Sequence, residues 1–143
     1  MPQQVQAVIA PWLLQPGDPL PGLPLADGLW TPAPFSGFWA IVVVSARPET
    51  LAPPDQIRLL GIASPQTRTS APPGWHADSG TLCAQRLGAL VGADTVATVA
   101  VLLDPAGTVV ASAAAEDINA LIADLAAQVP AKARGQLNPS SSR

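Results

Sequence analysis

IVVVSARPET, residues 41–50, begins as an unbroken apolar run and ends in a polar loop that contains a proline. With Trp39 and Ala40 before it, the run predicts a strand over residues 39–45 that is covered on both faces of a sheet, because no polar residue alternates with the apolar ones. In open α/β folds, the loops after the carboxyl ends of such strands carry most binding and catalytic groups. The loop that starts at Ala46 is therefore the first candidate for a functional site.

The composition is that of a single globular domain. The chain has 143 residues, of which 48% are hydrophobic and only 12% are charged, and this length is sufficient to bury a core. The net charge is −3, and the seven Lys and Arg residues form no cluster, which argues against a nucleic-acid-binding surface. No apolar run approaches the ~18 residues that a membrane helix needs. We therefore expect neither a nucleic-acid nor a membrane partner.

The start of the chain and its cysteine content predict a cytoplasmic protein. The segment MPQQVQAVIAPWLLQPGD lacks the basic part and the continuous apolar part of a signal peptide, and the single cysteine, Cys83, excludes an internal disulfide. We expect residues 1–15 to form an N-terminal extension, residues 16–129 the domain, and residues 130–143 a disordered polar tail.

Strands and helices alternate along the rest of the chain. The expected elements are a hairpin around Asp27 and Gly28, one helical turn over residues 55–58, strands over 57–64, 75–78, 97–103 and 108–112, and helices over 79–90 and 115–128. This order predicts a three-layer α/β/α sandwich with a central mixed sheet. Eight apolar residues are expected to share one core: Val42, Val44, Leu60, Ile62, Val99, Val101, Leu121 and Leu125.

Three motifs occur in an order that one known family shares: PGDPLPGLPLADG at residues 16–28, ADSGTLCAQRLGAL at 77–90, and VLLDPAGTVVAS at 101–112. The set resembles the peroxiredoxins or redoxins, the alkyl hydroperoxide reductase/thiol-specific antioxidant family. Members of that family commonly open with a Pro-Gly-Asp-x-x-Pro hairpin and have a strand-Asp-Pro-x-Gly-strand hairpin near the end. The resemblance implies a thioredoxin-like α/β/α sandwich with a central mixed sheet and an N-terminal β-hairpin.

The resemblance also implies a catalytic loop, Pro-x-x-x-Thr-x-x-Cys, after the first central strand, in which the Thr and a distant Arg stabilise the thiolate. Counted from Pro48, the Thr position falls on Ala52 and the Cys position on Asp55. Counted from Thr50, the Cys position falls on Pro53. Neither alignment supplies a thiol.

The other catalytic groups of the family are missing as well. The position of its arginine falls on Thr98, and a Cys-x-x-Cys pair is impossible with one cysteine. No proline stands immediately before the strand at 97–103. We therefore assign no catalytic, cofactor-binding or metal residue. The loop is interpreted as a vestigial active site made of Arg47, Pro48, Thr50 and Asp55.

Cys83 leaves one catalytic alternative open. Near a helix N-terminus it would serve as the nucleophile of a divergent one-cysteine thiol peroxidase or oxidoreductase. Its place in an apolar stripe is, in contrast, typical of a core cysteine. The other members of that stripe are Leu87, Leu90 and Val91.

His76 has two interpretations. With Asp78 and Ser79 it suggests a hydrolase trio, but residues this close in sequence rarely reach the geometry of a catalytic triad, and a loop histidine is the more ordinary reading. The tryptophans are either an aromatic binding surface or residues that cover the core: Trp30, Trp39 and Trp75.

We expect a non-catalytic redoxin-like domain that acts as a protein- or ligand-binding module without a cofactor. Degenerate modules of this kind occur beside flavin hydroxylases and iron(II)/2-oxoglutarate oxygenases, an analogy that rests on fold alone. The expected partner is a protein, and a homodimer stays open. The alternative is the thiol peroxidase that uses Cys83.

Overall fold

The computed structural model describes residues 14–20, 22–31, 37–52, 56–64, 72, 75–91 and 95–130. Its main feature is a five-stranded mixed sheet with the strand order β5-β4-β3-β8-β9. The strands of this sheet are β3 (Trp39–Ser45), β4 (Ile57–Ala63), β5 (Trp75–Ala77), β8 (Val99–Leu103) and β9 (Val109–Ala114). β3, β4 and β5 run parallel, whereas β8 is antiparallel to both β3 and β9.

β3 and β8 form the centre of the sheet. Residues 40–44 and 99–103 are each at most 1% exposed, so these two strands are buried on both faces. The unbroken apolar run in β3 is the sequence counterpart of this environment, because each face of the strand meets another layer. The predicted central strand over 39–45 is confirmed.

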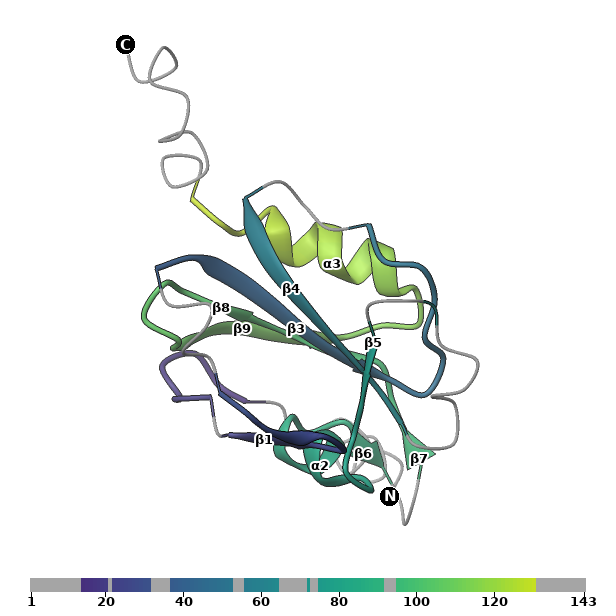
Figure 1. The fold of residues 1–143 in the computed structure, drawn as a ribbon. Helices are drawn as coiled ribbons and strands as arrows, with labels where there is room; N and C mark the ends of the chain where they lie inside the picture. The colour runs from purple at the N-terminus through teal and green to yellow at the C-terminus, as the bar shows by residue number, and fades with distance from the viewer. Residues whose placement is uncertain are drawn as a thin grey trace, which may run out of the picture.

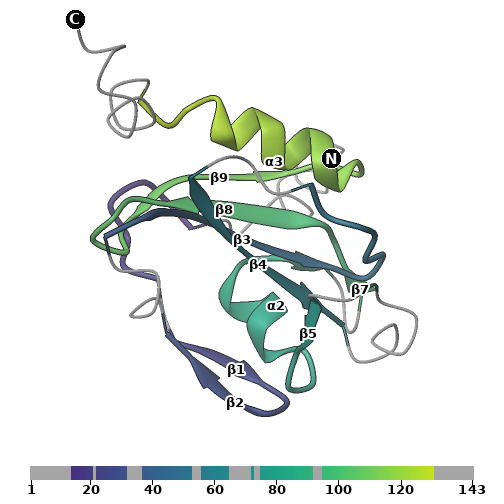
Figure 2. The same cartoon turned by 45° about the horizontal axis from the view of Figure 1, so that its top comes forward.

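Two layers cover the sheet (Figures 1 and 2). α3 (Ile118–Ala126) lies on one face, and α2 (Leu82–Arg86) lies on the other together with the hairpin of β1 (Leu23–Leu25) and β2 (Gly28–Trp30). The hairpin pairs Leu25 with Gly28, as the Asp27-Gly28 turn predicted. The three-layer α/β/α arrangement with an N-terminal β-hairpin is thus confirmed.

The two faces of the sheet have separate cores. Side chains alternate along a strand, so Val42 and Val44 face the α2 layer whereas Ile41 and Val43 face α3. The prediction of one shared core was therefore wrong. Six of its eight residues lie in the α2-side cluster, but Leu121 and Leu125 lie in the cluster beneath α3.

The helix predicted over residues 79–90 is shorter in the structure. α2 ends at Arg86 because Gly88 takes a left-handed φ of 77°, which turns the chain away from the helix axis. Residues Leu90–Val91 then form β6, which pairs with β7 (Thr95–Val96). The predicted apolar helical stripe was consequently wrong for Leu90 and Val91, which lie on a strand.

Other boundaries moved by a few residues. α3 begins at Ile118 because the Asp117 carboxylate accepts the N–H of Ala120 (3.1 Å) and caps the helix there. The expected helical turn over residues 55–58 was wrong, since Ile57 and Arg58 already belong to β4. Asp55 lies outside the described residues, as does the expected tail beyond Pro130.

The turn between β8 and β9 is confirmed. Its carboxylate holds it closed, because Asp104 Oδ1 accepts the N–H groups of Ala106 (2.9 Å) and Thr108 (3.0 Å). The N–H of Gly107 also donates to the Asp104 carbonyl oxygen (2.9 Å). The Asp-Pro-x-Gly motif thus has a structural role in this chain.

Candidate functional site

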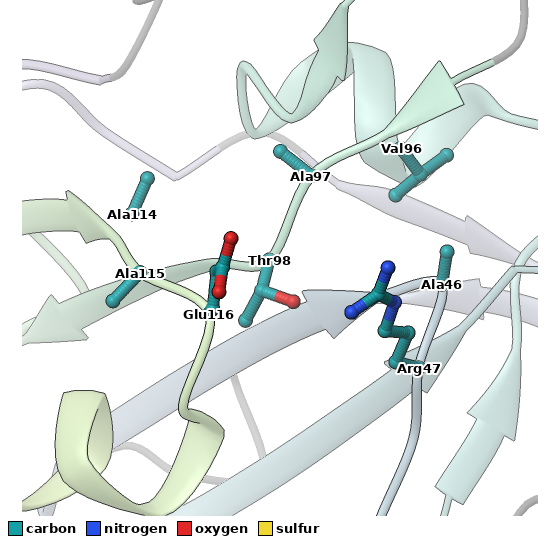
Figure 3. A pocket seen from close by; sticks show the side chains of 8 residues that line it. All are labelled: Ala46, Arg47, Val96, Ala97, Thr98, Ala114, Ala115 and Glu116. Atoms are coloured by element: carbon teal, nitrogen blue, oxygen red, sulfur yellow. The ribbon is translucent and has the colours of Figure 1, made fainter.

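A pocket of about 390 Å³ opens at the edge of the sheet where β3 ends and β8 begins (Figure 3). These ends meet because the two strands are antiparallel, with Val44 opposite Val99. The last residues of β9 and the residues after it complete the wall. The lining residues are Ala46, Arg47, Val96, Ala97, Thr98, Ala114, Ala115 and Glu116. The edge that the sequence singled out therefore does carry a pocket.

A pair of hydroxyl groups joins the end of β3 to the residue before β8, next to this pocket. Ser45, the last residue of β3, is 0% exposed, and its Oγ lies 2.7 Å from Oγ1 of the half-buried Thr98. The same Oγ accepts the N–H of Arg47 (2.9 Å). Ser45 thus holds the backbone of the loop at Arg47, two residues after the end of β3.

Two side chains from other elements hold the rest of the loop. The side-chain amide of Asn119, on α3, donates to the carbonyl oxygen of Thr50 (2.9 Å) and accepts the N–H of Ala52 (2.9 Å). The indole N–H of Trp75, on β5, donates to the carbonyl oxygen of Glu49 (2.8 Å). The loop after β3 is therefore fixed at both its start and its middle.

Opposite charges enter the pocket from two directions. In Figure 3 the Arg47 guanidinium lies toward Ala46, the Glu116 carboxylate lies on the β9 side, and Thr98 lies between them. Both charged side chains are exposed. Within the described residues no ion pair joins Arg47 to Glu116.

The structure brings together only part of the predicted vestigial loop. Arg47 lines the pocket, but Pro48 and Thr50 do not, and Asp55 lies outside the described residues. Thr98, on which the resemblance places the family's arginine, lines the pocket together with Arg47.

Sequence reasoning did not identify Ser45 or Glu116 as site residues. Ser45 carried a usable signal, because a hydroxyl at the end of an otherwise apolar strand needs a hydrogen-bond partner when it is buried. No sequence signal pointed to Glu116, because its proximity to the loop after β3 depends on how β9 pairs in the sheet.

Cys83 lies away from the pocket, in the core between α2 and the hairpin. Its side chain is 0% exposed, and its Sγ donates to the carbonyl oxygen of Pro24 (3.2 Å). Burial, reinforced by the neighbouring Asp78 carboxylate, raises the pKa of the Cys83 thiol far above its ordinary value. The interpretation as a core cysteine is confirmed by this burial.

The hydrolase trio of His76, Asp78 and Ser79 does not form. Both carboxylate oxygens of Asp78 face α2, where they accept the N–H groups of Cys83 (2.8 Å) and Ala84 (3.2 Å). Asp78 is 3% exposed, whereas His76 is exposed on the edge strand β5. Asp78 therefore caps α2 and does not orient the imidazole.

The tryptophans do not share one surface. Trp39 and Trp75 pack against the α3-side core, and Trp30 packs against the other core. Among the described residues, no three His, Cys, Asp or Glu side chains are grouped so that they could hold a metal ion. In the same part of the chain, no helix has the length and apolar character needed to cross a membrane.

Comparison with known proteins adds structural relatives only. No protein-family profile and no curated protein sequence matches the chain. Among solved structures, the chain is similar to a thiol peroxidase from Chromobacterium violaceum, with 17% identity and a TM-score of 0.53 over 92% of this chain and 90% of that one.

Two solved structures from Xanthomonas campestris are similar in the same way. Peroxiredoxin Q matches with 16% identity and a TM-score of 0.51, over 81% of this chain and all of that one. Bacterioferritin comigratory protein matches with 15% identity and a TM-score of 0.51, over the same shares of the two chains. At such identities the likeness establishes the fold, and the chain has the thioredoxin-like fold of the peroxiredoxins.

Proposed function

We propose that this thioredoxin-fold domain binds a ligand or a protein at the pocket beside Arg47 and performs no thiol chemistry. The main support is the separation of the sulfur from the pocket. The lining side chains supply a guanidinium, a hydroxyl and a carboxylate, whereas Cys83 is fully buried against Pro24.

Burial argues against the alternative of a peroxidase that uses Cys83. The reactive species in such an enzyme is the thiolate, and it must meet its substrate at the protein surface. At Cys83 the burial and the Asp78 carboxylate raise the pKa, so the thiol stays protonated at neutral pH. A peroxide would also have to displace α2 or the hairpin to reach the sulfur.

The pocket has the size and mixture of groups that suit a small ligand or the end of a peptide. Its volume of about 390 Å³ falls at the lower end of the range of small-molecule sites, which is ~300–1,000 Å³. Small-molecule sites combine apolar walls with a few placed polar groups. Here the walls are mainly alanines, and the polar groups come from three separate segments.

A peroxide assay tests the absence of thiol chemistry. Wild type and Cys83→Ser are compared for consumption of hydrogen peroxide, with dithiothreitol or thioredoxin as the reductant. We expect no turnover by either protein, and labelling of Cys83 by a thiol reagent only in denaturant. Turnover in wild type that disappears in Cys83→Ser would replace the proposal with the peroxidase alternative.

An NMR titration tests the binding role itself. The 15N-labelled domain is mixed with a set of small molecules that carry a carboxylate, an ammonium, a phosphate or combinations of these. We expect saturable shifts in the amide signals of residues 46–47, 96–98 and 114–116. Shifts confined to other surfaces would contradict the assignment of the pocket as a ligand site.

A further inference from the structure

We infer that the pocket binds a small zwitterion of the amino-acid class, with its carboxylate against Arg47 and Thr98 and its ammonium group against Glu116. This inference rests on the proposed function, because it specifies what the binding pocket takes. Four features of the pocket lead to it: the direction of a hydroxyl proton, the donor set around Arg47, the position of Glu116, and the small apolar walls.

The hydrogen bonds at Ser45 favour one direction for the proton of the Thr98 hydroxyl. Ser45 Oγ already accepts the N–H of Arg47, and within the described residues the only partner left for the Ser45 proton is Thr98 Oγ1. Because Ser45 is fully buried and its oxygen already accepts an N–H, its proton is satisfied when Ser45 is the donor to Thr98 Oγ1, and this is the direction we infer. The proton of Thr98 then remains for a group in the pocket.

Arg47 and Thr98 together present a donor set for a carboxylate. A guanidinium is a planar fork of N–H donors that matches the two oxygens of a carboxylate. The hydroxyl of Thr98, the residue directly before β8, adds a third donor. The backbone of Arg47 is held by Ser45 and the loop beyond it by Asn119, so the Arg47 side chain starts from a fixed position in the wall of the pocket that Thr98 also lines.

Glu116 supplies the opposite charge from the other side of the pocket. It stands directly before Asp117, whose carboxylate is engaged as the cap of α3, so Glu116 is the carboxylate that remains for the pocket. A ligand with only a negative charge would gain from Arg47 but would be repelled by Glu116. A ligand with both charges gains at both ends, and this favours a zwitterion.

The walls limit the ligand to a small body between its two charged ends. Apart from Arg47, Thr98 and Glu116, the lining residues are four alanines and Val96, and none of these offers a side-chain polar group. A short hydrocarbon segment fits such a surface, whereas a polar segment would lose its hydration without compensation. An α- or ω-amino acid has this construction.

The test titrates the 15N-labelled domain with single compounds: alanine, β-alanine and γ-aminobutyrate as zwitterions of increasing length, with acetate and propylamine as ligands with one charge. We expect at least one zwitterion to bind ten-fold or more tightly than either acetate or propylamine. The length that binds best then measures the separation of the two charged groups.

Variants assign the two ends of the ligand. Arg47→Gln and Glu116→Gln should each weaken binding of the best zwitterion ten-fold or more, and Thr98→Val should weaken it several-fold. The matched controls are Arg58→Gln and Asp124→Asn, which remove the same charges elsewhere. Arg58 stacks on Phe38 at the opposite end of β4, and Asp124 is exposed on α3. Both controls should bind as wild type does.

The outcomes separate this inference from the proposed function. Acetate or propylamine that binds at the pocket as tightly as every zwitterion would overturn the inference and leave the pocket a ligand site. Equal loss of affinity in Arg47→Gln and Arg58→Gln would also overturn it. No shift at the pocket with any compound would overturn both the inference and a small-ligand role for the domain.

Discussion

The pocket and the surroundings of Cys83 are held by similar hydrogen bonds, but the pocket is open to solvent and Cys83 is closed to it. In each, a buried polar side chain accepts backbone N–H groups: Ser45 accepts that of Arg47, and Asp78 accepts those of Cys83 and Ala84. At the pocket this leaves a hydroxyl, a guanidinium and a carboxylate facing solvent. At α2 it leaves a thiol enclosed by the helix and the hairpin.

The difference shows that solvent access decides which group is able to react or bind. Cys83 is the more reactive residue type, but its burial stabilises the neutral thiol. Arg47 and Glu116 are exposed charges that the fold brings to one pocket. A functional site on this fold is therefore identified by geometry and not by its most reactive residue.

The largest expected effect comes from the strand that supports both regions. Val101 is 0% exposed at the centre of β8, so Val101→Asp buries an unpaired carboxylate and should cost more than about 4 kcal/mol, enough to unfold a marginally stable domain. Circular dichroism and urea denaturation measure this. Leu29→Asp is the control, because Leu29 is 67% exposed and should change stability by less than about 0.5 kcal/mol. A folded Val101→Asp protein would refute the central position of β8.

The second prediction concerns a substitution that should expose Cys83 to solvent and leave the pocket unchanged. Asp78→Ala leaves two buried N–H groups of α2 without acceptors and should lower the free energy of unfolding by about 2–3 kcal/mol. Labelling of Cys83 should also become faster. Asp117→Ala, which removes a single exposed cap, should cost only about 1 kcal/mol. An equal loss in the two variants would mean that the enclosure of Cys83 does not depend on Asp78.

The third prediction uses the pH dependence of the free energy of unfolding to test whether Cys83 is shielded from solvent. The ordinary pKa of the Cys83 thiol is 9.0, and the folded protein raises it well above that. Above pH 9.0 the unfolded chain therefore loses a proton that the folded protein keeps, and stability falls by about 1.4 kcal/mol for each pH unit. Below pH 9.0 both states keep the proton and this contribution stays constant.

Cys83→Ala isolates this effect from the other groups that titrate at high pH. Urea denaturation of the two proteins between pH 7 and 10.5 should give parallel curves up to about pH 9 and a steeper fall for wild type above it. Parallel curves over the whole range would show that solvent reaches the thiol in the folded state.

The smallest expected effect concerns the loop that carries Arg47. Asn119→Ala removes two hydrogen bonds to the loop and should cost about 1 kcal/mol, with faster hydrogen exchange at the Ala52 amide. Asn119→Asp keeps the acceptor for Ala52 but loses the donor to Thr50, so the protection of that amide should largely remain. Unchanged exchange in Asn119→Ala would mean that α3 does not hold the loop.

The sequence predicted the layers better than the lengths of their elements. The apolar run of β3, the Asp27-Gly28 hairpin and the Asp104 turn were each recognisable from a few adjacent residues. The end of α2 was missed because Gly88 lies inside a stretch whose apolar spacing still fits a helix. Spacing alone does not show where a left-handed residue turns the chain.

The candidate site, like the fold, was only partly indicated by the sequence. Arg47 was named from the sequence only as part of a vestigial active-site loop, because the loop after a buried strand is a general position for function. Its partners in the pocket come from distant segments: Thr98 directly precedes β8, and Glu116 lies between β9 and α3. No local pattern relates them to Arg47.

By itself, the sequence determined the fold class and the absence of a thiol from the loop after β3, because apolar periodicity and residue identity are local properties of the chain. Only the tertiary structure decided that Cys83 is closed to solvent and that Arg47, Thr98 and Glu116 share one pocket. Burial and proximity are set by how distant segments pair and pack. In this protein, the antiparallel pairing of β8 with both β3 and β9 brings those three residues to the same edge of the sheet.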